Sequence, residues 1–123
     1  MIIAVLDASA LLAWLQDEPG ADVVNDLLEK GAACSAVNYA EVAQKVLARG
    51  GNWVLSADLM ASYDLQLEPA IPDDAVVAAV LWKQGDQLSL ADRFCLATAQ
   101  RLGVPAWTTD RAWGEGEGIR QVR

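Results

Sequence analysis

A short apolar run at the start of the chain, followed at once by a helical segment, limits the available folds more than any other feature. Residues 2–6 are uniformly apolar (IIAVL), which is typical of a strand buried on both faces, because a half-exposed strand alternates apolar and polar residues. Residues 8–18 then have a helix-like pattern. A strand covered on both faces needs helices on both sides of its sheet, so this start predicts a parallel α/β fold.

The rest of the chain repeats this alternation of strands and helices. We expect further helices at residues 21–30, 38–51, 56–64, 72–84 and 89–103, and further strands at 32–36, 65–69 and 104–109, with 118–122 as a candidate fifth strand. The length of 123 residues suits one core. We therefore predict one domain over residues 1–123, a three-layer α/β/α fold with a mostly parallel central sheet of four to five strands.

Composition excludes several chemistries and compartments. The chain has no histidine, which rules out a Ser-His-Asp triad, a Cys-His dyad and an imidazole zinc site. Cys34 and Cys95 form no CxxC pair and are expected to be buried thiols in a reducing compartment. No basic residue precedes the first apolar run, and Asp7 interrupts it, so we expect a cytoplasmic protein with neither a signal peptide nor a membrane span.

Acidic residues stand where predicted strands pass into helices. Asp7 closes the first strand, Glu41 lies in the first turn of the helix after the second, Asp92 lies in the first turn of a late helix, and Asp110 follows the fourth strand. In an open parallel sheet these junctions share one edge, and ligands bind there. We expect the four carboxylates to lie at that edge.

Helix capping is the alternative explanation for each of these acids taken singly. A carboxylate near a helix N-terminus satisfies free backbone N–H groups and complements the helix dipole. Asp7 or Ser9 fits as the cap of the first helix, residues 89–92 match a capping box, and residues 38–41 form a looser version with an Asn cap. Capping alone therefore accounts for any one of the acids.

Helical wheels place Asp92 and Glu41 on opposite kinds of helix face. Asp92 points to the mostly apolar side of its helix, where a carboxylate needs a cation or strong donors. Glu41 instead lies beside Lys45 and away from the apolar stripe, which favours a solvated ion pair, although its place near the sheet edge keeps a role in a site open.

The expected clustering of acids favours a bound cation. Two carboxylates ~4 Å apart repel by ~4 kcal/mol at an effective dielectric constant near 20, and a divalent cation removes that cost. Oxygen ligands without histidine or thiolate suit Mg²⁺ or Mn²⁺. Such a site polarises a phosphoryl oxygen and activates a water molecule for attack on phosphorus.

The chain resembles a known family over nearly its whole length. The resemblance rests on three motifs in order: VLDASALLAWL, SAVNYAEV and LSLADRFCLATAQRLGVPAWTTDRAW. The chain resembles the PIN-domain ribonucleases, and specifically the VapC-type toxins of bacterial and archaeal toxin-antitoxin pairs. The resemblance implies that Asp7, Glu41 and Asp92 hold the metal ion, with Asp110 as the fourth acid. It also implies that Ser9 and Thr108 or Thr109 support these acids by hydrogen bonds.

The same resemblance implies a function. It predicts a metal-dependent endoribonuclease that cuts single-stranded RNA and leaves a 5′-phosphate, forms a homodimer and is inhibited by a cognate antitoxin protein. The net charge of −8 makes the chain a poor general RNA binder, so any grip on RNA must be local and assisted by metal.

Other classes compete with this interpretation. A haloacid-dehalogenase-like phosphatase needs a second Asp two residues after the first, where this chain has Ser9, and a response-regulator receiver needs a late lysine, whereas the last one here is Lys83. A catalytically silent PIN-like module, whose acidic edge binds a basic protein partner, remains the alternative to an enzyme.

Overall fold

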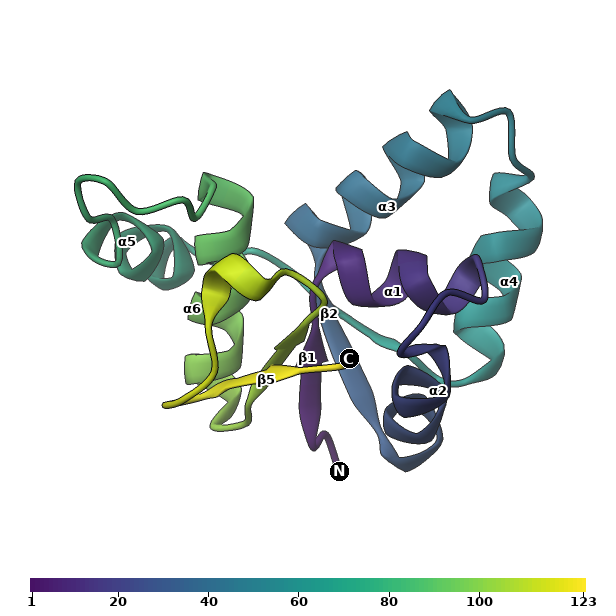
Figure 1. Ribbon diagram of the computed structural model, residues 1–123, viewed down its shortest axis with the longest axis horizontal. Helices are drawn as coiled ribbons and strands as arrows, with labels where there is room; N and C mark the ends of the chain where they lie inside the picture. Colours follow the sequence, from purple (N-terminus) through teal and green to yellow (C-terminus); the bar gives the residue numbers. More distant parts are fainter.

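The computed structural model describes residues 1–123 and contains one sheet of five parallel strands (Figure 1). The strands are β1 (Ala4–Leu6), β2 (Ala32–Ser35), β3 (Gln66–Glu68), β4 (Ala106–Thr108) and β5 (Ile119–Gln121). Their order across the sheet is β3-β2-β1-β4-β5, and each neighbouring pair is parallel. The predicted parallel sheet is confirmed, and residues 119–121 supply its fifth strand.

Helices cover both faces of the sheet. They are α1 (Ala8–Leu15), α2 (Ala21–Lys30), α3 (Ala36–Ala48), α4 (Trp53–Ser62), α5 (Pro72–Val80) and α6 (Leu90–Leu102), and a 3-10 turn, η1, spans Arg111–Trp113. Figure 1 shows α1 to α4 on one side of the strands and α5 with α6 on the other. The three layers expected from the sequence are therefore present. None of the helices is long and apolar enough to cross a membrane.

The central strand divides its side chains between two cores. Ala4 and Leu6 pack into the larger apolar cluster beneath α1 to α4, whereas Val5 packs into a smaller cluster with Cys95 and Ala99 of α6. All three residues of β1 are fully buried. This arrangement explains why the first strand is apolar at every position, because neither of its faces meets water.

The strand order reverses between β1 and β4. The chain moves from β1 through β2 to β3 on one side, and then returns through α5 and α6 to place β4 on the other side of β1. The carboxyl ends of β1 and β4 are therefore neighbours at the switch point of the topology. In open parallel sheets this is where ligands bind.

Several helix boundaries differ from those expected. The helix α3 begins at Ala36 and is capped by Ser35, whose hydroxyl accepts a hydrogen bond from the Val37 N–H at 3.2 Å. Asn38 is therefore inside the helix rather than its N-cap, and Glu41 lies in the second turn rather than the first. The helix α5 ends at Val80, before a turn that includes Gly85 at a φ of 82°.

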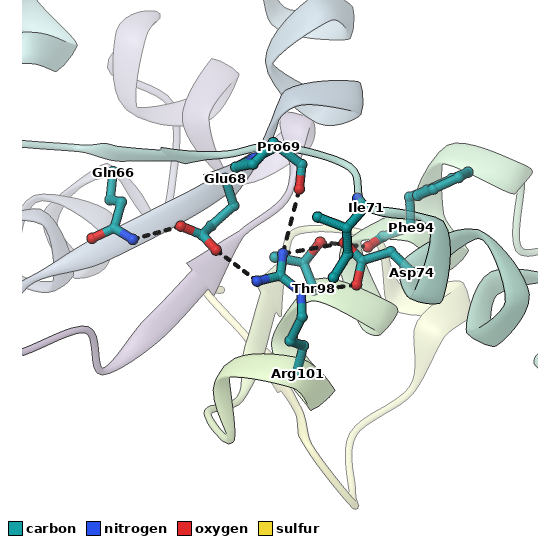
Figure 2. A network of polar contacts seen from close by, with 8 residues as sticks. All are labelled: Gln66, Glu68, Pro69, Ile71, Asp74, Phe94, Thr98 and Arg101. Carbon is teal, nitrogen blue, oxygen red and sulfur yellow. Dashed lines mark hydrogen bonds and ion pairs between the residues drawn. The ribbon is translucent and has the colours of Figure 1, made fainter.

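A polar network joins the edge strand to the helices on the α6 side (Figure 2). The Arg101 guanidinium donates to both oxygens of Asp74, at 3.0 and 3.1 Å, and to Glu68 Oε1 at 2.9 Å. Asp74 is 1% exposed and Glu68 is 9% exposed. Hydrogen bonds from Gln66 and Arg101 hold the pKa of Glu68 below its usual value. One cation thus ties β3 and α5 to the end of α6.

We predict that Arg101→Ala lowers the free energy of unfolding by about 2–3 kcal/mol, because it leaves two largely buried carboxylates without their cation. Urea denaturation measures this change. The control is Lys30→Ala, which removes an exposed ion pair with Asp26 and should cost under about 1 kcal/mol. Equal effects of the two substitutions would contradict the structural role of the network.

Candidate active site

Asp7 is buried at the junction of β1 and α1. It is the N-cap of α1, where its Oδ1 accepts a hydrogen bond from the Ala10 N–H at 2.8 Å. Ser9 Oγ donates to Oδ1 at 2.7 Å, and Thr108 Oγ1 donates to Oδ2 at 2.6 Å. The residue is 4% exposed. The capping explanation is therefore correct for Asp7, but both of its oxygens also receive side-chain hydroxyl donors.

The environment of Asp7 disfavours its charge. Burial raises the pKa of Asp7 to about 6, although hydrogen bonds from Thr108, Ala10 and Ser9 lower it, and the negative charge of Asp92 adds to the increase. A rise of one pKa unit corresponds to about 1.4 kcal/mol of free energy. Keeping Asp7 ionised at neutral pH therefore costs the folded protein about 3 kcal/mol. The three ion pairs of the structure do not include Asp7. A buried carboxylate with donors but no cation is a natural ligand for a metal ion.

Hydroxyl groups connect Asp7 to the end of β4. Thr108 Oγ1, which donates to Asp7, also accepts a hydrogen bond from the Asp110 N–H at 3.0 Å. Ser9 Oγ accepts one from the Thr109 N–H at 3.0 Å. Ser9 and Thr108 thus contact Asp7 through their side chains, whereas Thr109 reaches this network through its backbone.

The exposed Asp110 side chain caps the turn that follows β4. Its Oδ1 accepts a hydrogen bond from the Ala112 N–H at 2.9 Å. The backbone N–H of the same residue is held by Thr108, so Asp110 is fixed beside the end of β4. The other carboxylate oxygen, Oδ2, receives no hydrogen bond.

Glu41 and Asp92 approach the same edge from α3 and α6. Asn38 Nδ2 donates to Glu41 Oε1 at 2.9 Å and to the carbonyl oxygen of Ala91, the residue before Asp92, at 3.1 Å. Asp92 and Ser89 form the capping box expected from the sequence. Asp92 is half-buried, and Glu41 makes no ion pair with the lysine one turn further on. The solvated ion pair favoured by the helical wheel is therefore absent.

The four acids lie at one end of the sheet but do not converge on a point. The negative charge of Asp92 acts on Asp7. Burial raises the pKa of the Cys34 thiol, and the negative charges of Asp7 and Glu41 raise it further. However, no three acidic or thiol groups are close enough to hold one ion as they stand. Asp92 and Asp110 each use one oxygen as a helix cap, and the second oxygen of each accepts no hydrogen bond.

The donor set nevertheless fits a hard divalent cation. Every side-chain ligand at this edge is an oxygen, and histidine is absent from the chain. The buried Asp7 lacks a counter-charge, and Asn38 Oδ1 is a buried acceptor with no donor in the protein. Sequence reasoning treated Asn38 only as a possible helix cap. Its hydrogen bond to Ala91 joins residues 53 positions apart, so no local sequence pattern indicates it.

Comparisons with known proteins identify the family of the chain. The model of the PIN domain matches residues 4–117. A VapC ribonuclease of Mycobacterium bovis and ribonuclease VapC42 of Mycobacterium tuberculosis are each 30% identical to this chain over 112 residues, covering 82% of this chain and 86% of the relative. The chain belongs to the PIN-domain family. Within that family, its similarity is to the VapC-type ribonucleases.

Solved structures share the fold at lower identity. A toxin-antitoxin complex from Klebsiella pneumoniae contains a chain with a TM-score of 0.76 and 19% identity, with 98% of each chain covered. DNA-bound VapBC from Salmonella typhimurium gives a TM-score of 0.74 at 17% identity over the whole of both chains. VapC20 of Mycobacterium tuberculosis, described as a sarcin-ricin loop cleaving toxin, gives 0.70 at 19%, covering 93% of this chain and 97% of that one.

We predict that Asp7→Asn stabilises the metal-free protein at neutral pH by up to about 3 kcal/mol. The amide keeps an oxygen for the Ala10 N–H and has no charge to bury. Because the folded state raises the pKa of Asp7, the wild-type protein gains stability from the neutral carboxyl below about pH 4 and loses it as the pH rises through about 6. The advantage of the variant should therefore be absent near pH 4 and complete above about pH 7.

Urea denaturation in EDTA at these pH values measures the difference between the two proteins. The acidic measurement serves as the control, because there the carboxyl and the amide are both uncharged. A variant that is less stable than the wild type at neutral pH would show that the buried charge of Asp7 is not destabilising.

Proposed function

We propose that this protein is an endoribonuclease that hydrolyses RNA phosphodiester bonds with bound Mg²⁺ or Mn²⁺, and that it is the toxin of a type II toxin-antitoxin pair. The observation that carries the proposal is the buried Asp7 carboxylate, held by three donors at the switch point between β1 and β4 without a cation. The ribonuclease names of the relatives support the chemistry. The two free, buried thiols, Cys34 and Cys95, suit the cytoplasm.

In this proposal Asp7, Glu41 and Asp92 hold the metal ion, and Asp110 is the fourth acid. A bound divalent cation polarises a phosphoryl oxygen and lowers the pKa of a water molecule. Ser9 and Thr108 keep the Asp7 carboxylate in one orientation through both of its oxygens.

Three of the proposed ligands, Asp7, Asp92 and Asp110, also accept hydrogen bonds from backbone N–H groups at the start of a helix or 3-10 turn. The capping bonds of Asp92 and Asp110 each use one oxygen, which leaves the other oxygen of each carboxylate for the ion. If an ion draws either side chain away from its cap, the lost hydrogen bond costs about 1 kcal/mol. The caps therefore restrain these side chains without blocking a metal site.

The charge of the chain restricts how it can hold RNA. The net charge is −8, so the phosphate backbone is repelled by most of the surface. Arg111 is exposed in η1, immediately after Asp110, and supplies a positive charge at the acidic edge. We assign the contact with RNA to this edge, with the metal ion and Arg111 as its positive groups.

The proposed protein partner is a cognate antitoxin. The structural neighbours from Klebsiella pneumoniae and Salmonella typhimurium come from toxin-antitoxin assemblies. An acidic edge complements a basic antitoxin segment. The same complementarity supports the alternative function, a catalytically silent PIN-like module that binds a basic protein without cleaving RNA.

Cleavage of end-labelled RNA distinguishes these two functions. We predict metal-dependent cleavage that EDTA abolishes and that Asp92→Asn reduces by at least about 100-fold, since the substitution removes a negative ligand. The variant is suited to this test because its amide oxygen can still accept the Ser89 N–H bond of the capping box. Asp58→Asn, which makes the same charge change at an exposed position of α4, should leave cleavage unchanged.

Two results of this experiment would contradict the proposed enzyme. Equal cleavage by Asp92→Asn and the wild-type protein would exclude Asp92 from the reaction. Wild-type protein that binds Mn²⁺ and a basic antitoxin but cleaves no RNA would favour the silent binding module.

We also propose a homodimer that forms through α5. This helix packs on α6 and leaves Val76 and Val80 on its outer side, 63% and 77% exposed, with Trp82 exposed just beyond its end. Exposed apolar side chains grouped in this way mark a protein contact. A second copy of the chain is a symmetric partner that buries the same patch twice.

We predict that Val80→Glu converts the dimer to a monomer, because it places two like charges in the paired surface. Light scattering at micromolar concentration measures the mass. Val54→Glu, at a similarly exposed position of α4 (69%), is the matched control and should remain dimeric. A monomeric wild-type protein, or a dimeric Val80→Glu, would rule out this interface.

A further inference from the structure

Asn38 occupies an unusual position between two helices of the acidic edge. It is the third residue of α3 and is fully buried. Its Nδ2 group donates to Glu41 Oε1 on the same helix and to the Ala91 carbonyl oxygen in the first turn of α6. One amide therefore connects the Glu41 carboxylate to the backbone next to Asp92.

The orientation of this amide is fixed by its neighbours. Turning it over would place Oδ1 against Glu41 Oε1 and the Ala91 carbonyl, which are both acceptors, so only the observed orientation gives hydrogen bonds. The cost is that Oδ1 faces no donor in the protein although it is buried. An unpaired buried acceptor is destabilising, and an apolar side chain of similar size would avoid it.

We propose that Asn38 is a positioning residue for the metal site: it fixes the Glu41 carboxylate against the first turn of α6 and so sets its place relative to Asp92. The inference rests on the proposed function, since Glu41 needs a fixed place only if the edge binds a cation.

The reason for such a tether is the weakness of the other restraints on Glu41. The side chain is half-buried, and the Asn38 amide is its only hydrogen-bond partner. It has no ion pair, and it shares the edge with the negative charges of Asp7 and Asp92. Without the amide, repulsion and rotational freedom would move the carboxylate toward solvent.

Mn²⁺ titration by calorimetry tests the assignment independently of RNA cleavage. Asn38→Ala should weaken Mn²⁺ binding by about 10–100-fold, the loss typical of a partner that orients a metal ligand. Asn38→Leu, which has the same branched arrangement of side-chain heavy atoms as Asn but a larger volume, removes the unpaired acceptor and should keep the fold while weakening binding to a similar extent. Both variants should lower kcat for RNA with little change in KM.

The control is Ser35→Ala, which removes the N-cap of the same helix. Ser35 is fully buried and bonds the Val37 N–H but makes no hydrogen bond to Glu41 or α6. It should reduce thermal stability and leave Mn²⁺ affinity unchanged. A loss of affinity in Ser35→Ala as large as in Asn38→Ala would overturn the assignment, because any damage to α3 would then have the same effect.

A double-mutant cycle shows whether Asn38 acts through Glu41. If it does, Asn38→Ala should have no further effect on Mn²⁺ affinity in the Glu41→Gln background, whereas independent effects would multiply. Wild-type affinity in Asn38→Ala and Asn38→Leu would overturn the positioning role and leave the proposed function standing. Wild-type protein that binds Mn²⁺ without cleaving RNA, with the cycle as expected, would overturn the proposed function and leave Asn38 as a positioning residue.

Discussion

The burial of the Asp7 carboxylate at the end of β1 is the constraint that organises the polar edge of this protein. A carboxylate in this position must receive donors, and the structure supplies them from α1, from Ser9 and from Thr108 of the neighbouring strand. The strand order brings Thr108 there, because β4 returns to the side of β1 opposite β2. The topology of the sheet therefore determines whether the hydrogen-bonding needs of one acidic side chain are met, because β4 carries the Thr108 hydroxyl that completes the set of donors around Asp7.

Local sequence patterns predict the parts of this edge that local contacts determine. The apolar run of β1, the cap formed by Asp7 and the capping box of Ser89 and Asp92 each depend on residues within a few positions of one another, and all three are present. The predicted start of α3 was wrong because Ser35 and Asn38 are both residue types that favour the N-cap position. Tertiary contacts decide between them, since the buried Asn38 side chain donates a hydrogen bond to the Ala91 carbonyl oxygen of α6, far along the chain.

Arg101 shows the same limit on the other side of the sheet. On the helical wheel it lies with Arg93 and Gln100 in a narrow polar arc, which by itself indicates a solvated side chain. The acids that it binds, Asp74 and Glu68, are 27 and 33 residues away, so no periodicity within α6 reveals them. Only the packing of α5 against α6, and the approach of Glu68 on the edge strand, make this arginine a structural cation rather than a surface charge.

Capping and metal binding are compatible roles for the acids of this edge. Repulsion between clustered carboxylates argues against a purely structural role, but helix N-termini offset part of that repulsion, because Asp7 and Asp92 each lie at the positive end of a helix dipole. Each cap of Asp92 and Asp110 uses one oxygen and leaves the other without a hydrogen bond. The helix ends thus allow these like charges to lie close together without a cation. The oxygens of Asp92 and Asp110 that accept no hydrogen bond, and the unfavourable burial of the Asp7 charge, make this edge a favourable place for a divalent ion to bind.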